Sequence, residues 1–418
     1  MTVTIREEAV VRKTAWRLVP FMGLLYVVSF LDRVNVGYAA LTMNTDIGLS
    51  ASAFGLGAGI FFLGYFLFEV PSNLIMQRVG ARTWIARILI TWGIISMGMA
   101  AVQGPRSFYA ARFLLGLAEA GFFPGMILYL TYWFPAAERA RIIGWFMLAI
   151  PVSNVIGAPL STALLERPLF GLTGWQTMFV VEGLPAVLLG FVVLAWLPDR
   201  PSSAAWLAAD EKVTLAALVS RDAPRADRLR DALASPRVWL LALVYFGLVI
   251  GLYGLGFWAP QIISAFGTLS DSQVGLVAAI PYSVAGVAMV LWGRHSDRSR
   301  ERTWHVALPA WFGAAGFAMS ALVASPYASL AALTAGAVGI YAAMPVFWTL
   351  PTAMLAGTAA AGGIAFINSL GNLGGYLGPF AIGWLKDATG GYSAGMYVLA
   401  AGMFAAGAIV VAMRKDRV

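Results

Sequence analysis

Apolar stretches of about 20 residues, separated by short polar or charged turns, dominate the pattern of this chain. About 20 apolar residues in a helix cross the ~30 Å hydrocarbon core of a bilayer. The pattern therefore predicts an all-α membrane protein with twelve transmembrane helices. The expected spans are 17–41, 53–76, 83–102, 108–131, 142–164, 174–196, 238–263, 273–293, 303–323, 328–351, 361–384 and 392–413.

One long polar connection, residues 198–237, separates the first six predicted spans from the last six. Its composition favours a partly helical linker on the cytoplasmic side. We therefore expect an N-terminal six-helix bundle over 1–197, this linker, and a C-terminal six-helix bundle over 238–418.

The two halves repeat one another. "RVGARTW" at 78–84 matches "RSRERTW" at 298–304, and the same offset of 220 places Pro159 over Pro379. One offset in two distant places indicates a duplication. Two parallel six-helix repeats are the architecture of many secondary transporters, which bind their substrate in mid-membrane between the halves.

Composition and charge support a membrane protein and orient it. Only 11% of the residues are charged, against about 25% in soluble domains. Of the 28 lysines and arginines, only Arg106, Arg167 and Lys386 fall in loops that would be external if the N-terminus is inside. Because positively charged loops stay in the cytoplasm, we expect both termini to be cytoplasmic. The same rule accounts for the net charge of +8 without nucleic-acid binding.

The start, "MTVTIREEAVVRKTAW", indicates a cytoplasmic tail rather than a cleavable signal peptide. The absence of cysteine fits a multi-pass protein of a bacterial inner membrane.

Four charged residues lie deep within predicted spans: Asp32 and Arg33 in the first, Arg112 and Glu119 in the fourth. Each costs roughly 2.5–3.5 kcal/mol on insertion scales. The last six spans hold no such charge away from their ends. We therefore expect binding and coupling of ions to depend on the N-terminal half.

Helix geometry separates the roles of these four residues. Neighbours point about 100° apart, so Asp32 is expected to face an arginine and Arg33 the centre. Arg112 and Glu119 share a helix face but lie about 10.5 Å apart, too far for an ion pair. We assign Arg33 and Arg112 to substrate binding and Asp32 and Glu119 to proton coupling. Glu119 is the preferred proton carrier because it shares the face of Arg112, although the choice stays open.

Uncharged polar and aromatic residues complete the predicted site. Asn368 and Asn372 in span 11 are four apart and share a face. Asn154 occupies a similar place in span 5, and Tyr65 and Trp348 are candidates to close the site. Two other acidic residues, Glu69 and Glu182, are interpreted as structural.

Several motifs resemble the major facilitator superfamily. "WGRHSDRSRERT" keeps Gly293, Asp297 and Arg298 of its basic loop, whereas Gln77 replaces the corresponding Asp in the first copy. "FLDRVNVGYA", "GYFLFEVPSNLI", "RFLLGLAEAGFFPG", "FWTLP" and "GIAFINSLGNLGGYLGP" resemble its anion:cation symporter family. That family contains permeases for tartrate, phthalate, hydroxyphenylacetate and galactonate. The resemblance implies proton-coupled uptake of an organic anion by alternating access, with the proton as coupling ion, no other cofactor, and a monomer.

Other functions have less support. A sodium-coupled or uncoupled anion carrier and a drug or metabolite exporter remain alternatives. An enzyme is not expected, because the sequence shows no nucleophile–base cluster, phosphate-binding loop or metal-ligand set. The two histidines, His295 and His305, are expected to flank a cytoplasmic loop without forming a cluster.

Overall fold

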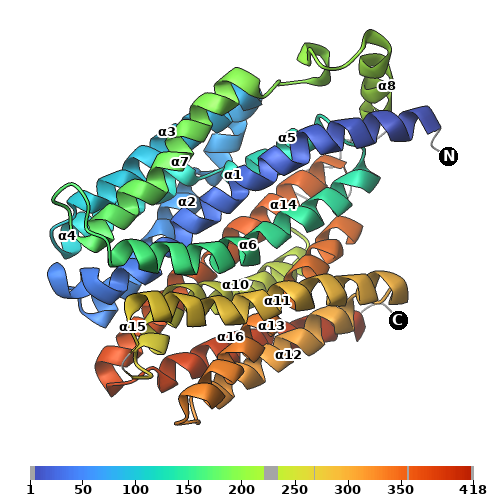
Figure 1. The fold of residues 1–418 in the computed structure, drawn as a ribbon. Coiled ribbons are helices and arrows are strands. Elements are labelled where there is room, and N and C mark those ends of the chain that lie inside the picture. Colours follow the sequence, from blue (N-terminus) through green and yellow to red (C-terminus); the bar gives the residue numbers. More distant parts are fainter. Residues whose placement is uncertain (1–4, 221–233, 268, 355–356, 416–418) are drawn as a thin grey trace.

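The computed structural model describes residues 5–220, 234–267, 269–354 and 357–415, and every regular element in these ranges is helical (Figure 1). The helices of the N-terminal half are α1 (Ile5–Asp46), α2 (Ala51–Val79), α3 (Ala81–Gly98), α4 (Pro105–Glu119), α5 (Phe122–Thr131), α6 (Ala136–Leu165) and α7 (Gly174–Trp196).

The predicted linker contains α8 (Ala209–Ser220). The helices of the C-terminal half are α10 (Pro236–Ser264), α11 (Asp271–Ser299), α12 (Thr303–Ser320), α13 (Pro326–Met354), α14 (Gly357–Asn372), α15 (Gly374–Thr389) and α16 (Ser393–Lys415). The order of elements agrees with the predicted order of spans.

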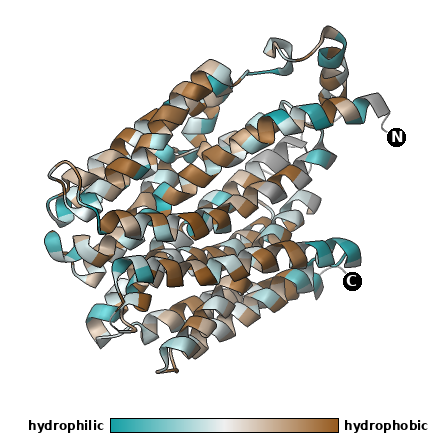
Figure 2. Cartoon of the chain, in the orientation of Figure 1, coloured by the Kyte–Doolittle hydropathy of each residue, from teal (hydrophilic) through white to brown (hydrophobic). Residues whose placement is uncertain are grey.

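Ten helical stretches among the described residues are long and apolar enough to cross a membrane. One of them joins α4 and α5, from Pro105 to Thr131. Helix α12 and the pair α14 and α15, which coincide with predicted spans 9 and 11, fall outside these ten. Figure 2 shows apolar residues along the lengths of the helices and polar residues gathered at their ends. The all-helical fold is thus confirmed, and ten stretches fit membrane spans in length and composition, while the count of twelve spans stays a prediction.

Helix α1 begins and helix α16 ends on the same side of the bundle, where α8 also lies (Figure 1). Lys13 of α1 donates a hydrogen bond of 2.6 Å to Glu211 of α8 and so holds the linker helix against α1. This bond lowers the pKa of the Glu211 carboxyl. We refer to this side as the terminal side; its location in the cytoplasm stays a prediction.

The helix is interrupted directly after Glu119, and this interruption separates α4 from α5. Gly121 has a φ of +83°, a region that glycine adopts far more readily than other residues. A Cβ atom on Gly121 would also lie 2.6 Å from the Cβ of Ser72 on α2. The break therefore depends on glycine, and it makes Glu119 the last residue of α4. A second break, at Leu373, separates α14 from α15.

The two halves contact each other mainly through α2 with α15, α6 with α11, and α1 with α10; α14 also contacts α2, and α13 contacts α6. Glycines permit the closest approaches. A Cβ atom on Gly37 of α1 would lie 2.9 Å from the carbonyl oxygen of Gly256 on α10, and one on Gly275 of α11 would lie 2.5 Å from that of Ala158 on α6. These close contacts hold the halves together away from the terminal side.

Two carboxylates cap helices of the opposite half on the side away from the termini. Glu166, which follows α6, accepts a hydrogen bond of 2.8 Å from the backbone N–H of Ser272 in the first turn of α11. Asp387 of α15 accepts one of 2.7 Å from the N–H of Ser52 in the first turn of α2. Ser52 and Ser272 are 220 positions apart, so the two capped serines follow the sequence repeat. The bonds from Ser272 lower the pKa of Glu166 and favour its ionised form.

A valine at position 275 should separate the halves on this side, because its Cβ would overlap with α6. The chain has no cysteine, so the pair Ser52→Cys and Asp387→Cys can report on closure. We expect Gly275→Val to slow disulfide formation between this pair at least tenfold. Gly23→Val is the control, since a Cβ on Gly23 meets nothing within 4 Å. Equal rates of disulfide formation in Gly275→Val and Gly23→Val would contradict a role of the contact between Gly275 and α6 in closing this side.

Candidate functional site

Arg33 and Glu119, assigned to different roles from the sequence, form an ion pair between α1 and α4. Arg33 Nη2 donates a hydrogen bond to Glu119 Oε1, and the same oxygen accepts a hydrogen bond of 2.9 Å from the hydroxyl of Ser29, one turn earlier on α1. Both charged side chains are buried. Each charge therefore depends on the other, because a buried charge without a partner is strongly destabilising.

The guanidinium of Arg33 also reaches the C-terminal half. Arg33 Nη1 donates a hydrogen bond of 2.9 Å to the hydroxyl oxygen of Tyr253 on α10. Its Cζ lies 5.4 Å from the ring centroids of both Phe61 and Tyr65 on α2. The predicted substrate residues Arg33 and Tyr65 are thus brought together at the contact between the halves.

Asp32 does not face an arginine, contrary to the expectation from the sequence. Its Oδ2 accepts a hydrogen bond of 2.6 Å from the indole N–H of Trp92 on α3, and its Oδ1 has no hydrogen-bond partner among the described residues. The turn of about 100° between neighbours aims Arg33 at the interface and Asp32 into the N-terminal bundle. The nearby acidic residues Glu182 and Glu119 would repel an ionised Asp32.

Arg112 is completely buried and forms no ion pair with Glu119 within the described part of the chain. Its Nη2 donates a hydrogen bond of 3.1 Å to the carbonyl oxygen of Ala58, while its Nε and Nη1 have no hydrogen-bond partner among the described residues. Its Cζ lies 5.0 Å from the ring centroid of Phe61, the ring that Arg33 also contacts. Two arginines therefore approach one aromatic ring. In the described ranges, Arg112 has two donors without a partner and Arg33 has one, its Nε.

The remaining predicted residues lie in different surroundings. Asn154 donates hydrogen bonds to the carbonyl oxygen of Ile150 (3.0 Å) and to the hydroxyl of Tyr341 on α13 (3.5 Å). Trp348 is buried against the ring of Tyr245, with centroids 4.8 Å apart. Asn372 is buried at the end of α14, next to the helix break. These three positions stay candidates for substrate binding.

Asn368 contacts an acidic residue that we interpreted as structural. Its amide donates a hydrogen bond of 2.6 Å to Glu69 Oε1, and the hydroxyl of Ser369 donates to Glu69 Oε2. Glu69 and Ser369 were missed in the prediction of the site, as were Tyr253 and Trp92. The available signal was a buried acidic residue in span 2 without a basic residue near it in sequence.

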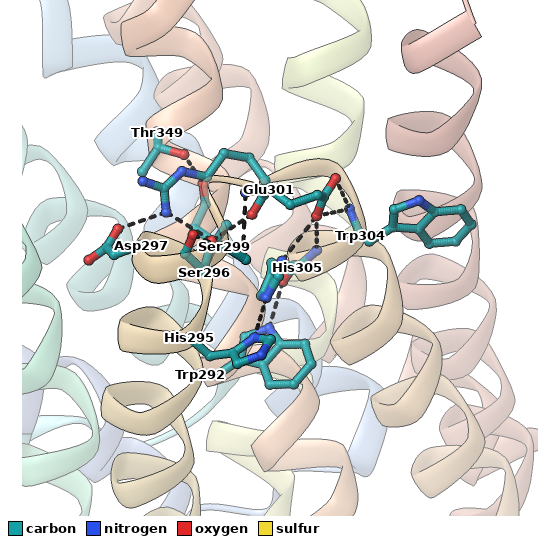
Figure 3. A network of polar contacts seen from close by, with 11 residues as sticks. Trp292, His295, Ser296, Asp297, Ser299, Glu301, Trp304, His305 and Thr349 are labelled. Carbon is teal, nitrogen blue, oxygen red and sulfur yellow. Dashed lines mark hydrogen bonds and ion pairs between the residues drawn. The ribbon is translucent and has the colours of Figure 1, made fainter.

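The histidines do form a cluster, so that expectation was wrong. His295 Nδ1 and His305 Nε2 lie 2.7 Å apart where α11 meets α12, and His305 Nδ1 lies 3.0 Å from Glu301 (Figure 3). Glu301 also accepts from the backbone N–H of Trp304 at the start of α12. The turn between the helices brings residues ten apart together. Among the described residues, no group of three or more metal-ligand side chains fits a metal ion.

Comparisons with known proteins agree with this architecture. The family model described as Major Facilitator Superfamily matches residues 22–361. A "putative tartrate transporter" of Agrobacterium vitis is 56% identical over 409 residues, covering 97% of this chain and 94% of that protein. A "quinolone resistance transporter" of Acinetobacter baumannii is 46% identical over 399 residues, covering 94% and 92%.

A solved structure shares the fold. The xylose transporter XylE from E. coli, in a "partially occluded inward open conformation", matches with a TM-score of 0.77 at 14% identity and covers 97% of this chain and 98% of that one. At this identity the likeness supports the fold alone.

The buried pair predicts a large coupling in stability. Arg33→Ala should leave Glu119 without a counter-charge and lower the free energy of unfolding by about 3–5 kcal/mol. The double variant Arg33→Ala/Glu119→Ala should lose clearly less free energy of unfolding than Arg33→Ala alone. Thermal unfolding in detergent at pH 8 measures both. The exposed pair Lys13 and Glu211 is the control, with an expected coupling of at most about 1 kcal/mol. Additive effects of the two buried substitutions would contradict the ion pair.

Proposed function

We propose that this chain, which belongs to the Major Facilitator Superfamily, takes up an organic anion together with protons. The observation that carries the proposal is the buried ion pair between Arg33 and Glu119 at the contact between the halves. The chain is a transporter by its family and its relatives. Substrate class, direction and coupling ion are what we propose.

The first step is a competition for Arg33. In the present state Glu119 is paired with the Arg33 guanidinium, so the charge of Arg33 is not available to a substrate. A proton on Glu119 removes the negative charge and weakens the pair, so that Arg33 becomes available to a carboxylate. A guanidinium binds a carboxylate through two parallel hydrogen bonds, a bidentate geometry that suits this role. Proton and anion then favour each other's binding, as symport requires.

The second step links binding to the movement of the halves. Arg33 holds Tyr253 of α10, so the same guanidinium contacts both halves. Replacing Glu119 by a substrate changes the contacts at this interface, and a ligand shifts a conformational equilibrium only through such differences in contact. Release of the proton on the other side restores the Arg33–Glu119 pair and expels the anion.

Arg112 and Asp32 have supporting roles in this proposal. The unused donors of Arg112, beside the same Phe61 ring, suit a second oxygen of the substrate. Asp32 stands next to Arg33 in sequence, and its Oδ1 has no hydrogen-bond partner among the described residues, so it is the second candidate to carry a proton. Asn154, Trp348 and Asn372 stay candidates for contacts with the remainder of the substrate.

A drug exporter is the second candidate function. The name of the Acinetobacter baumannii relative points to it, whereas that of the Agrobacterium vitis relative names an organic acid. The two buried arginines favour an anionic substrate over a cationic one.

Uptake into proteoliposomes tests the proposal directly. We expect an inward proton gradient to accelerate uptake of at least one acid from a panel of hydroxy, sugar and aromatic acids, and replacement of Na⁺ by choline to have no effect. A response to Na⁺ alone would indicate sodium coupling. No response to the proton gradient, or transport of cations only, would overturn the proposal.

Two substitutions separate binding from coupling. Arg33→Ala should abolish substrate binding, with a loss of at least a hundredfold, because the guanidinium holds the carboxylate. Glu119→Gln should preserve binding and counterflow but abolish proton-driven accumulation. Arg87→Ala is the control, since Arg87 lies against Trp84 of α3 and has no contact with the site. Normal binding by Arg33→Ala would refute the substrate assignment.

A further inference from the structure

Glu69 is held by the opposite half of the molecule through both of its carboxylate oxygens. The amide of Asn368 donates to Oε1 and the hydroxyl of Ser369 donates to Oε2. These donors are consecutive residues of α14, while Glu69 belongs to α2. All three side chains are buried. Asn368 and Ser369 thus form a binding element for one carboxylate, which we call the 368–369 element.

The surroundings of Glu69 supply no direct counter-charge. Among the described residues Glu69 takes part in no ion pair. The charged and titratable groups that face it are Arg33 from α1, Tyr65 from its own helix and Tyr245 from α10. The element therefore recognises a carboxylate by hydrogen bonds, and charge is balanced only at a distance by Arg33.

The 368–369 element lies close to the first carboxylate site. The Arg33 guanidinium lies 5.4 Å from the ring of Tyr65, and Tyr65 precedes Glu69 by one helical turn on the same face of α2. Two binding elements for carboxylates thus adjoin Tyr65, and each holds a carboxylate of the chain itself: Glu119 on Arg33, and Glu69 on Asn368 and Ser369.

We infer that the 368–369 element is a second carboxylate subsite and that the substrate is a short dicarboxylate. Glu69 binds a proton when it gives up its hydrogen bonds with Asn368 and Ser369 to the substrate. The inference rests on the proposed function, since Arg33 must hold the first carboxylate. A proton from the external solution converts the Glu69 carboxylate into a neutral carboxyl group and removes its charge from the subsite. The amide of Asn368 and the hydroxyl of Ser369 then donate to the second carboxylate of the substrate. This proton leaves Glu69 when the substrate is released, which couples one proton to the second carboxylate.

A matched pair of ligands tests the inference on the full-length protein. Threonate differs from tartrate by a hydroxymethyl group in place of one carboxylate. We expect the wild-type protein to bind tartrate at least tenfold more tightly than threonate at pH 6. The variant Asn368→Ala/Ser369→Ala should lose at least tenfold in tartrate binding and change threonate binding less than twofold.

The variant Glu69→Gln tests the proton. It places a neutral group at the subsite at every pH, so tartrate binding should become less dependent on pH between 6 and 8, and one proton fewer should enter with each tartrate. Glu182→Gln is the control: Glu182 is equally buried but bonds Ser161 within its own half, and its substitution should leave the proton count unchanged.

The inference would be overturned if the wild-type protein bound neither tartrate nor threonate, or bound both equally tightly. It would also be overturned if Asn368→Ala/Ser369→Ala lost affinity equally for both ligands. An unchanged number of protons per tartrate in Glu69→Gln would overturn it as well. The proposed function fails separately, through lack of response to a proton gradient across the whole acid panel or through normal binding by Arg33→Ala.

Discussion

A charge buried between two helix bundles is costly unless an opposite charge compensates it, and the pairing of Arg33 is the interaction on which the site depends. Arg33 is paired with Glu119 in the present state. Any departure of Glu119 needs a replacement anion, because an isolated buried charge is far more costly than a paired one. The contact of Arg33 with Tyr253 places this exchange where the halves meet. One side chain therefore takes part both in the charge balance of the site and in the contact between the halves.

The sequence predicts what depends on one helix at a time, and much less of what depends on helix packing. The apolar pattern locates the helices, and the insertion cost of charges identifies Asp32, Arg33, Arg112 and Glu119. The angle between neighbours predicts that Asp32 and Arg33 point apart. It does not reveal that Glu119 pairs with Arg33, since that depends on how α4 lies against α1.

Glu69 shows the same limit more sharply. Viewed along its own helix it is an isolated acidic residue near the terminal side of span 2, which favours a structural interpretation. Its partners, Asn368 and Ser369, lie about 300 positions away in the other half. Sequence reasoning selected Asn368 for its polarity but could not match it with Glu69. Likewise, only the fold of the turn after α11 brings His295 against His305.

The two carboxylate caps on the side away from the termini have a consequence for an incoming ligand. Glu166 and Asp387 cover the first backbone N–H groups of α11 and α2, each from the opposite half. Such helix starts carry a positive partial charge of about half a unit. If the halves part on this side, the caps are withdrawn and both helix starts are exposed at the entrance. The opening movement itself would then create an electrostatic attraction for anions at the entrance, before any of them reaches Arg33.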